Sequence, residues 1–84
     1  MFYVYILMSS EGRFYIGSTE DIQKRLDQHN KKTFGGWTAR FNNWRVIYSE
    51  EFLSRTEALI REKKIKSYKG GAAFKKLISS SLGS

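Results

Sequence analysis

The feature of this sequence that most constrains its fold is a pair of short apolar runs separated by a turn-forming segment. Residues 2–8 and 14–17 are rich in aromatic and β-branched side chains, and the segment between them contains serine and Gly12. This pattern predicts two antiparallel strands joined by a tight hairpin. If Gly12 is a left-handed bulge residue, the loop has an odd number of residues. Leu7 then faces Tyr15, and Tyr5 faces Gly17.

The length of this loop also decides which side chains share a face. An even loop would place Tyr5 and Tyr15 on opposite faces, because side chains alternate with a period of two. An odd loop separates polar from apolar residues, so we predict it. One face then carries Tyr3, Tyr5, Arg13, Tyr15 and Gly17. The other face carries Phe2, Val4, Ile6, Phe14 and Ile16.

A helix is expected directly after the second strand. Ser18 or Thr19 can cap it, and Glu20 and Asp21 would then lie in its first turn, where negative charge is favourable. We expect this helix to extend to about Lys32. A polar, glycine-containing loop follows over residues 33–43, with Phe34, Trp37 and Phe41 within it.

The second half of the chain adds a strand and two further helices. Residues 44–52 alternate and predict a third strand, and the capping box from Ser54 to Glu57 starts a helix that runs to about Tyr68. A short helix over residues 72–78 and a loose tail over 79–84 complete the chain. We therefore predict one α+β domain over residues 1–78, a small three-stranded antiparallel sheet flanked by helices. Its expected core is Phe2, Val4, Ile6, Phe14, Ile16, Leu26, Val46, Ala58, Leu59 and Ile65.

Charge and composition narrow the classes of partner. The 84 residues carry a formal net charge of +7, which favours a polyanion, nucleic acid before a membrane surface. The chain has no cysteine and one histidine, so neither a disulfide framework nor a structural zinc site is expected. Residues 2–8 form the longest apolar run, which is too short to span a bilayer and follows no basic segment. We expect a soluble cytoplasmic protein.

Three side chains on the predicted helices are candidates for chemistry. Arg25 and His29 lie one turn apart at the margin of the first helix's buried stripe; each could also be a solvated charge or a partner of the helix dipole. Glu62 lies within the apolar stripe of the second helix, where a carboxylate must be paired, protonated or bound to a cation. Pairing with Arg25 or a lysine, and binding of a metal, both remain open. Ile60 lies off this stripe, and the last helix could cover it.

Basic and aromatic residues supply candidate contacts to nucleic acid. The basic run on the second helix is either a solvated face or a surface that follows phosphates. Trp37 and Phe41 could stack on bases or pack against the sheet. The candidate nucleic-acid-binding residues are Arg13, Lys24, Trp37, Arg40, Lys63 and Lys66.

In combination these motifs resemble the GIY-YIG nuclease family, in particular its small stand-alone bacterial members. The triplet from Tyr3 to Tyr5 is similar to the first family triplet, with Tyr3 in place of glycine, and Tyr15-Ile16-Gly17 matches the second. Arg25 and His29 resemble the family's helix-borne arginine and the histidine or tyrosine one turn later. The segment ending at Glu62 resembles the one that ends in the metal-binding glutamate. An asparagine that some members place after this helix has no counterpart here.

The resemblance implies a divalent-metal-dependent endonuclease that hydrolyses DNA, with branched or damaged DNA as candidate substrates. Glu62 would hold one Mg²⁺ or Mn²⁺, Arg25 would bind a non-bridging phosphate oxygen, and Tyr15 would position water or phosphate. Tyr5 would accept the proton of the attacking water, with His29 as an alternative base or relay. Because a free tyrosine has a pKa of about 10, the phenols would need a pKa depressed by the metal and Arg25. The alternative is a nucleic-acid-binding module of the same fold. The oligomeric state is left open, and a dimer is one option.

Overall fold

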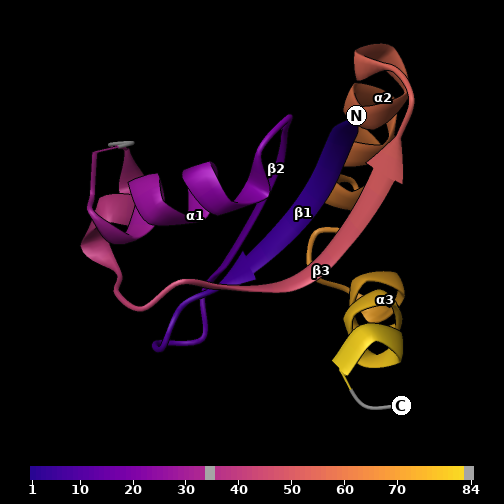
Figure 1. Ribbon diagram of the computed structural model, residues 1–84. Helices are drawn as coiled ribbons and strands as arrows, with labels where there is room; N and C mark the ends of the chain where they lie inside the picture. The colour runs from indigo at the N-terminus through magenta and orange to yellow at the C-terminus, as the bar shows by residue number, and fades with distance from the viewer. Residues whose placement is uncertain (34–35, 83–84) are drawn as a thin grey trace.

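The hairpin, the third strand and the helices form an α+β domain in a computed structural model that describes residues 1–33 and 36–82. The elements are β1 (Phe2–Met8), β2 (Phe14–Thr19), α1 (Ile22–Asn30), the 3-10 helix η1 (Trp37–Arg40), β3 (Arg45–Phe52), α2 (Arg55–Lys66) and α3 (Ala72–Leu82). The sheet is antiparallel and three-stranded, as predicted, and its strand order is β2-β1-β3. Figure 1 shows α1 on one side of this sheet and α2 and α3 on the other. Phe34, which we placed in the loop, lies outside the described residues.

The predicted hairpin register is confirmed. Leu7 pairs with Tyr15 and Tyr5 pairs with Gly17. Gly12 has a φ of 83°, a left-handed conformation that glycine adopts without steric cost. The loop is closed by a hydrogen bond of 3.0 Å from the Gly12 amide to the Ser9 carbonyl oxygen. Tyr5 and Tyr15 therefore share a face.

Both faces of the sheet are buried, which corrects the expectation of one apolar and one polar face. Val4 and Ile6 pack with residues of β3, α2 and α3. On the opposite face Tyr5 is 1% exposed and Leu7 is fully buried, and both pack with Trp44 against α1. The tyrosine face is thus a second core, closed by Ile22, Leu26, Phe41 and Val46.

The buried stripe of α2 is narrower than predicted. It contains Ala58 and Ile65, which lie seven residues apart and therefore on one side of the helix. Leu59 is 48% exposed and Ile60 is 65% exposed, so the prediction of a core Leu59 and a covered Ile60 is wrong. The last helix does not cover Ile60, because α3 packs against β3 and places Phe74 against Phe14.

Helix ends differ from the predictions in two places. Asp21, not Ser18 or Thr19, caps α1, and its carboxylate accepts from the Lys24 amide at 3.0 Å. Thr19 is unavailable as the cap because β2 continues to it and pairs it with Tyr3. The last helix continues to Leu82, so part of the expected tail is helical. The capping box of α2 is confirmed, since the Ser54 hydroxyl accepts from the Glu57 amide at 3.2 Å.

Two polar clamps fix the helices on β3. The Asn30 side chain donates to the Trp44 carbonyl at 3.0 Å and accepts from the Trp44 amide at 2.7 Å. Arg61 of α2 donates to both oxygens of Glu50, through Nε to Oε1 and through Nη2 to Oε2, each at 2.9 Å. The Tyr48 hydroxyl also donates to Glu50. These contacts hold the end of α1 and the middle of α2 in fixed positions relative to the sheet. Across residues 1–33 and 36–82, no helix is long and apolar enough to cross a membrane.

Candidate active site

The two phenols of the hairpin lie side by side, and Gly17 makes this arrangement possible. The ring centroids of Tyr5 and Tyr15 are 6.1 Å apart. The Tyr5 side chain crosses Gly17, its partner on β2. A Cβ atom at Gly17 would lie 2.8 Å from the Tyr5 hydroxyl oxygen and 2.9 Å from Cε2 of Tyr15. The glycine is therefore required by side-chain packing.

His29 extends the phenol pair toward α1 and the 3-10 helix. Its ring centroid lies 4.6 Å from that of Tyr15, and the residue is fully buried. Its Nδ1 lies 3.2 Å from the Thr38 hydroxyl oxygen, and Thr38 is itself held by a hydrogen bond of 3.1 Å from the Trp44 indole to its carbonyl. Thr38 was missed by the sequence analysis because a threonine in a polar loop gives no signal. His29 is thus a fixed member of the aromatic cluster rather than a solvated partner of the helix dipole.

Arg25 and Glu62 bring opposite charges to the phenols from two different helices. The positive charge of Arg25 lowers the pKa of Tyr5 and Tyr15, whereas the negative charge of Glu62 raises it. Because such effects weaken with distance, both charges lie within electrostatic reach of the phenol pair. Of the five residues predicted as catalytic, Tyr5, Tyr15 and His29 are thus in contact, and Arg25 and Glu62 act on the phenols electrostatically.

Burial decides the protonation of these groups. It raises the pKa of Tyr5 far above the ordinary value, and the neighbouring Tyr15 raises it further. Burial also raises the pKa of Tyr15. The expected depression of the phenol pKa by Arg25 is therefore outweighed in the protein alone. The pKa of His29 is lowered by burial and by the charge of Arg25, so this imidazole is neutral at pH 7 and can accept a proton.

Glu62 is paired with a lysine, one of the two states left open by the sequence. Its Oε2 lies 2.7 Å from Nζ of Lys66, one turn further along α2. The Glu62 side chain is 17% exposed and that of Lys66 is 54% exposed. Since Leu59 is exposed, Glu62 lies beside the buried stripe rather than within it.

The donor set around Glu62 fits one kind of metal site. No group of three or more histidine, aspartate or glutamate side chains that could hold a metal ion occurs in the described part of the chain. Mg²⁺ is commonly bound through one or two carboxylates, with water and substrate phosphate as the remaining ligands. A single partly buried carboxylate within electrostatic reach of two phenols matches such a substrate-completed site. It does not match a preformed protein cage.

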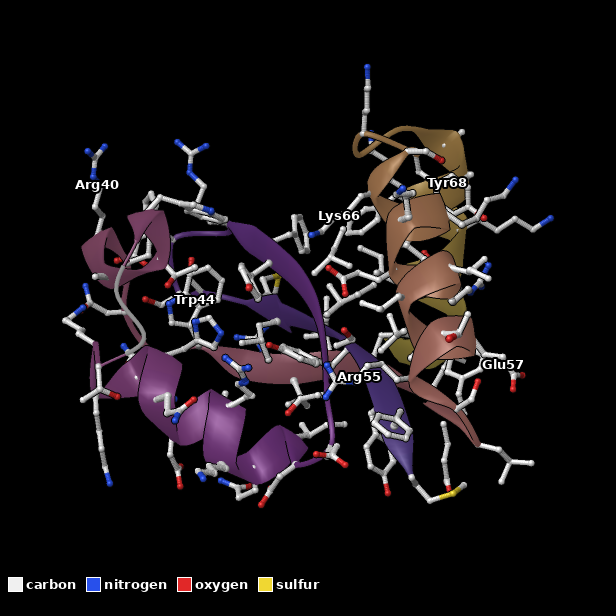
Figure 2. The ribbon with its side chains drawn as sticks, turned by 90° about the horizontal axis from the view of Figure 1, so that it is seen from above. Arg40, Trp44, Arg55, Glu57, Lys66 and Tyr68 are labelled. Atoms are coloured by element: carbon white, nitrogen blue, oxygen red, sulfur yellow. The ribbon has the colours of Figure 1, made fainter. Side chains whose placement is uncertain are left out.

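The predicted nucleic-acid contacts divide between two sides of the phenol pair. On the α1 side, Trp37 is 47% exposed, and its ring centroid lies 6.1 Å from that of Tyr15. The Arg13 guanidinium lies 5.3 Å from the Phe41 ring centroid, and Arg40 points away from the body of the protein (Figure 2). Lys24 lies on α1 itself, whereas Lys63 and Lys66 lie on α2, on the other side.

A cavity of about 460 Å³ opens between the N-terminal halves of α1 and α2. Three of its cationic residues are Lys24, Arg25 and Arg55, and its apolar part is formed by Phe2, Ala58 and Leu59. Arg55 also lies over the Phe2 ring, at 5.7 Å from its centroid. We had not singled out Arg55, because it follows the capping serine of α2 and resembles an ordinary first-turn residue.

The cluster can be compared with known proteins. The sequence profile described as the GIY-YIG catalytic domain matches residues 1–75 of the chain. The chain belongs to the GIY-YIG family. This confirms the resemblance inferred from the two triplets. GIY-YIG proteins are typically nucleases that commonly use divalent metals, and the family assignment gives the clustered phenols, arginine and glutamate a chemical context.

Within the GIY-YIG family the chain is similar to small proteins named UPF0213. It is 35% identical to the UPF0213 protein SSP2268 of Staphylococcus saprophyticus over 66 residues, which cover 79% of this chain and 80% of that protein. A UPF0213 protein of Staphylococcus aureus strain Mu3 is 33% identical over 66 residues, which again cover 79% of this chain and 80% of that protein. The solution NMR structure of the UPF0213 protein BH0048 from Bacillus halodurans is 27% identical. The match covers 100% of this chain and 99% of that one, with a TM-score of 0.47.

Proposed function

We propose that this protein is a divalent-metal-dependent endonuclease that hydrolyses DNA phosphodiester bonds. The observation that carries the proposal is the convergence of two phenols, an imidazole, a guanidinium and a carboxylate on one small region of the sheet. The net charge of +7 suits a polyanionic substrate. The family of nucleases to which the chain belongs supports the same reaction class.

The charged residues bind and orient the scissile phosphate. Arg25 donates to a non-bridging oxygen, for which its planar guanidinium is better suited than an ammonium group. Glu62 would hold Mg²⁺ or Mn²⁺, whose positive charge would stabilise the negative charge on the phosphate and the leaving oxygen. Arg13, Arg40 and Trp37 lie on the α1 side of the phenols, where they contact the flanking nucleotides.

Proton transfer is the task of the buried cluster. Tyr15 positions the attacking water or the phosphate, and Tyr5 or His29 receives the proton. His29 is already neutral, so it can act as the acceptor in the protein as it stands. Tyr5 needs additional positive charge nearby before its pKa falls into a useful range. His29 contacts Tyr15, which suits it to relay a proton away from the phenols.

The direct test is cleavage of labelled DNA by wild type and by Glu62→Gln with Mg²⁺ or Mn²⁺. The substrates are single-stranded, duplex, flap and four-way DNA, with RNA as a control. We expect metal-dependent cleavage that falls about hundredfold or more in the variant. Glu51→Gln removes the same charge from an exposed position on β3 and should cut like wild type. A Glu62→Gln variant with normal cleavage would contradict the metal-binding role.

Two observations favour the second candidate, a nucleic-acid-binding module without efficient cleavage. The carboxylate of Glu62 is occupied by Lys66, and burial raises the pKa of both phenols. A module of this kind binds DNA with an affinity that falls steeply as the salt concentration rises. It does not cleave the DNA, whichever divalent metal ion is added. Salt-sensitive binding without cleavage in the same assay would favour it.

A further inference from the structure

Glu62, the carboxylate proposed to bind the metal, already holds a cation that belongs to the protein. Nζ of Lys66 lies 2.7 Å from Oε2 of Glu62. The carboxylate is 17% exposed and the lysine 54%, so the pair lies at the edge of the site with the ammonium group toward solvent. Any divalent ion that binds Glu62 must therefore compete with Lys66.

Lys66 also lies near the phenol pair, where the proposed function places the substrate phosphate. Its positive charge lowers the pKa of Tyr15, which places it within electrostatic reach of the phenol pair. Figure 2 shows Lys66 on the side of α2 that faces the sheet. The ammonium group is thus paired with the carboxylate proposed to bind the metal and acts on a phenol proposed to orient the phosphate.

We propose that Lys66 is an exchangeable cation, which neutralises Glu62 in the free protein and moves to a phosphate oxygen of DNA when the metal binds. This inference rests on the proposed nuclease function. A lysine suits the exchange because its ammonium is a compact charge on a flexible stem with three donors. Ion pairs between residues i and i+4 of a helix shift an equilibrium only about twofold, so the exchange is easily driven.

Arg61, next to Glu62 in the chain, shows that α2 itself does not need to move when Lys66 leaves Glu62. Arg61 is bound to both oxygens of Glu50 on β3 and fixes the rotation of the helix. The Glu62–Lys66 pair is contained within α2 and joins no second element. Lys66 can therefore leave Glu62 by a change of side-chain conformation alone.

The exchange couples the two ligands. Metal binding to Glu62 breaks the ion pair, and the released lysine gains a partner when DNA binds. Metal should therefore raise the affinity for DNA, and DNA should raise the affinity for metal by the same factor. Removing the lysine should weaken this coupling, because the ion pair would no longer have to be broken.

The experiment measures the binding of metal and the binding of DNA separately. Mn²⁺ is titrated into wild type, Lys66→Ala and Lys64→Ala without DNA, and free Mn²⁺ is followed by electron paramagnetic resonance. We expect Lys66→Ala to bind Mn²⁺ about twofold tighter or more, because the competing cation is gone. Lys64 lies two residues away on an exposed part of α2, so Lys64→Ala should bind Mn²⁺ like wild type.

DNA binding is then measured as a function of salt with Ca²⁺ present and with a chelator. With Ca²⁺, the plot of log affinity against log salt should lose about one unit of slope in Lys66→Ala, which corresponds to one phosphate contact. Circular dichroism melting checks that each variant is folded, and Lys66→Gln provides a second neutral variant.

The outcomes separate this inference from the proposed function. If wild type binds both ligands but Lys66→Ala leaves Mn²⁺ affinity and salt slope unchanged, the role of Lys66 is overturned and the nuclease proposal stands. A variant that loses DNA affinity without gaining Mn²⁺ affinity makes Lys66 an ordinary phosphate contact and overturns the exchange. If wild type binds neither Mn²⁺ nor DNA, both proposals are wrong.

Discussion

The two faces of β1 are equally buried but are built from different kinds of residue. Val4 and Ile6 on one face are fully buried in an apolar cluster with α2 and α3. Tyr5 on the other face is 1% exposed, yet it packs against Tyr15 and Trp44, which in turn contact a buried histidine and a threonine. The alternation of a single strand thus divides the protein into an apolar core and an aromatic, titratable one.

The same degree of burial has different consequences on the two faces. On the Val4 face it removes apolar surface from water, which stabilises the fold. On the Tyr5 face it raises the pKa of the phenols and lowers that of the imidazole, and it requires partners such as Thr38 for buried polar atoms. Variants of the first face should therefore change stability, and variants of the second should change chemistry.

The largest effect is expected for Ile65→Ala on the apolar face. Ile65 is fully buried, so the truncation should lower the free energy of unfolding by about 2–5 kcal/mol. Urea denaturation measures this, and Ile65→Val, at about 0.5–1.5 kcal/mol, serves if the alanine variant is unfolded. Ile60→Ala on the exposed side of the same helix should stay within about 0.5 kcal/mol of wild type. Equal losses for both isoleucines would contradict the assignment of the core.

Tyr5→Phe on the aromatic face should have a small effect on stability and a large effect on cleavage. The ring stays in place, so we expect a stability loss of no more than about 1.5 kcal/mol. Cleavage should fall about hundredfold if the hydroxyl takes part in proton transfer, with DNA affinity unchanged. Tyr3→Phe on the same strand is the matched control. An unchanged cleavage rate in Tyr5→Phe would assign the proton acceptor to Tyr15 or His29.

The smallest effect is a pH dependence of stability that arises from His29. Its pKa is lowered in the folded state, so the unfolded chain binds more protons as the pH falls below about 6.5. The free energy of unfolding should therefore decrease as the pH falls from 7.5 toward 5.5. Denaturation of wild type and His29→Gln at each pH measures the difference, and the variant should be less pH-dependent over this interval. Parallel curves would show that His29 is not protected from protonation by the fold.

Local sequence rules predicted the parts of the fold that depend on local chemistry. The register of the hairpin follows from the conformation of Gly12, and the start of α2 follows from the Ser54 hydroxyl. Both depend on residues that are adjacent along the chain. The gathering of the tyrosines with Arg25 and Glu62 was inferred from a family resemblance, since no local rule relates α1 to α2.

The errors arose where long-range packing decides. Thr19 was taken as a helix cap, but pairing with Tyr3 keeps it in the strand. Leu59 was assigned to the core on helical periodicity, but the sheet contacts only the side of α2 that carries Ala58 and Ile65. The phenol pKa was expected to fall because Arg25 is near, whereas the effect of burial is larger. Burial, unlike charge, cannot be read from neighbouring residues in a sequence.

The clamp between Asn30 and Trp44 has a consequence for how such a protein can diversify. It joins Asn30 at the end of α1 to Trp44, the residue immediately before β3, and Thr38 between them adds contacts to His29 and to Trp44. Changing the length of a closed loop costs little conformational entropy. We therefore expect that insertions between Asn30 and Trp44 that keep Thr38 in place leave the phenols and His29 where they are. Related proteins could vary the length of this loop without rebuilding the aromatic core beside it.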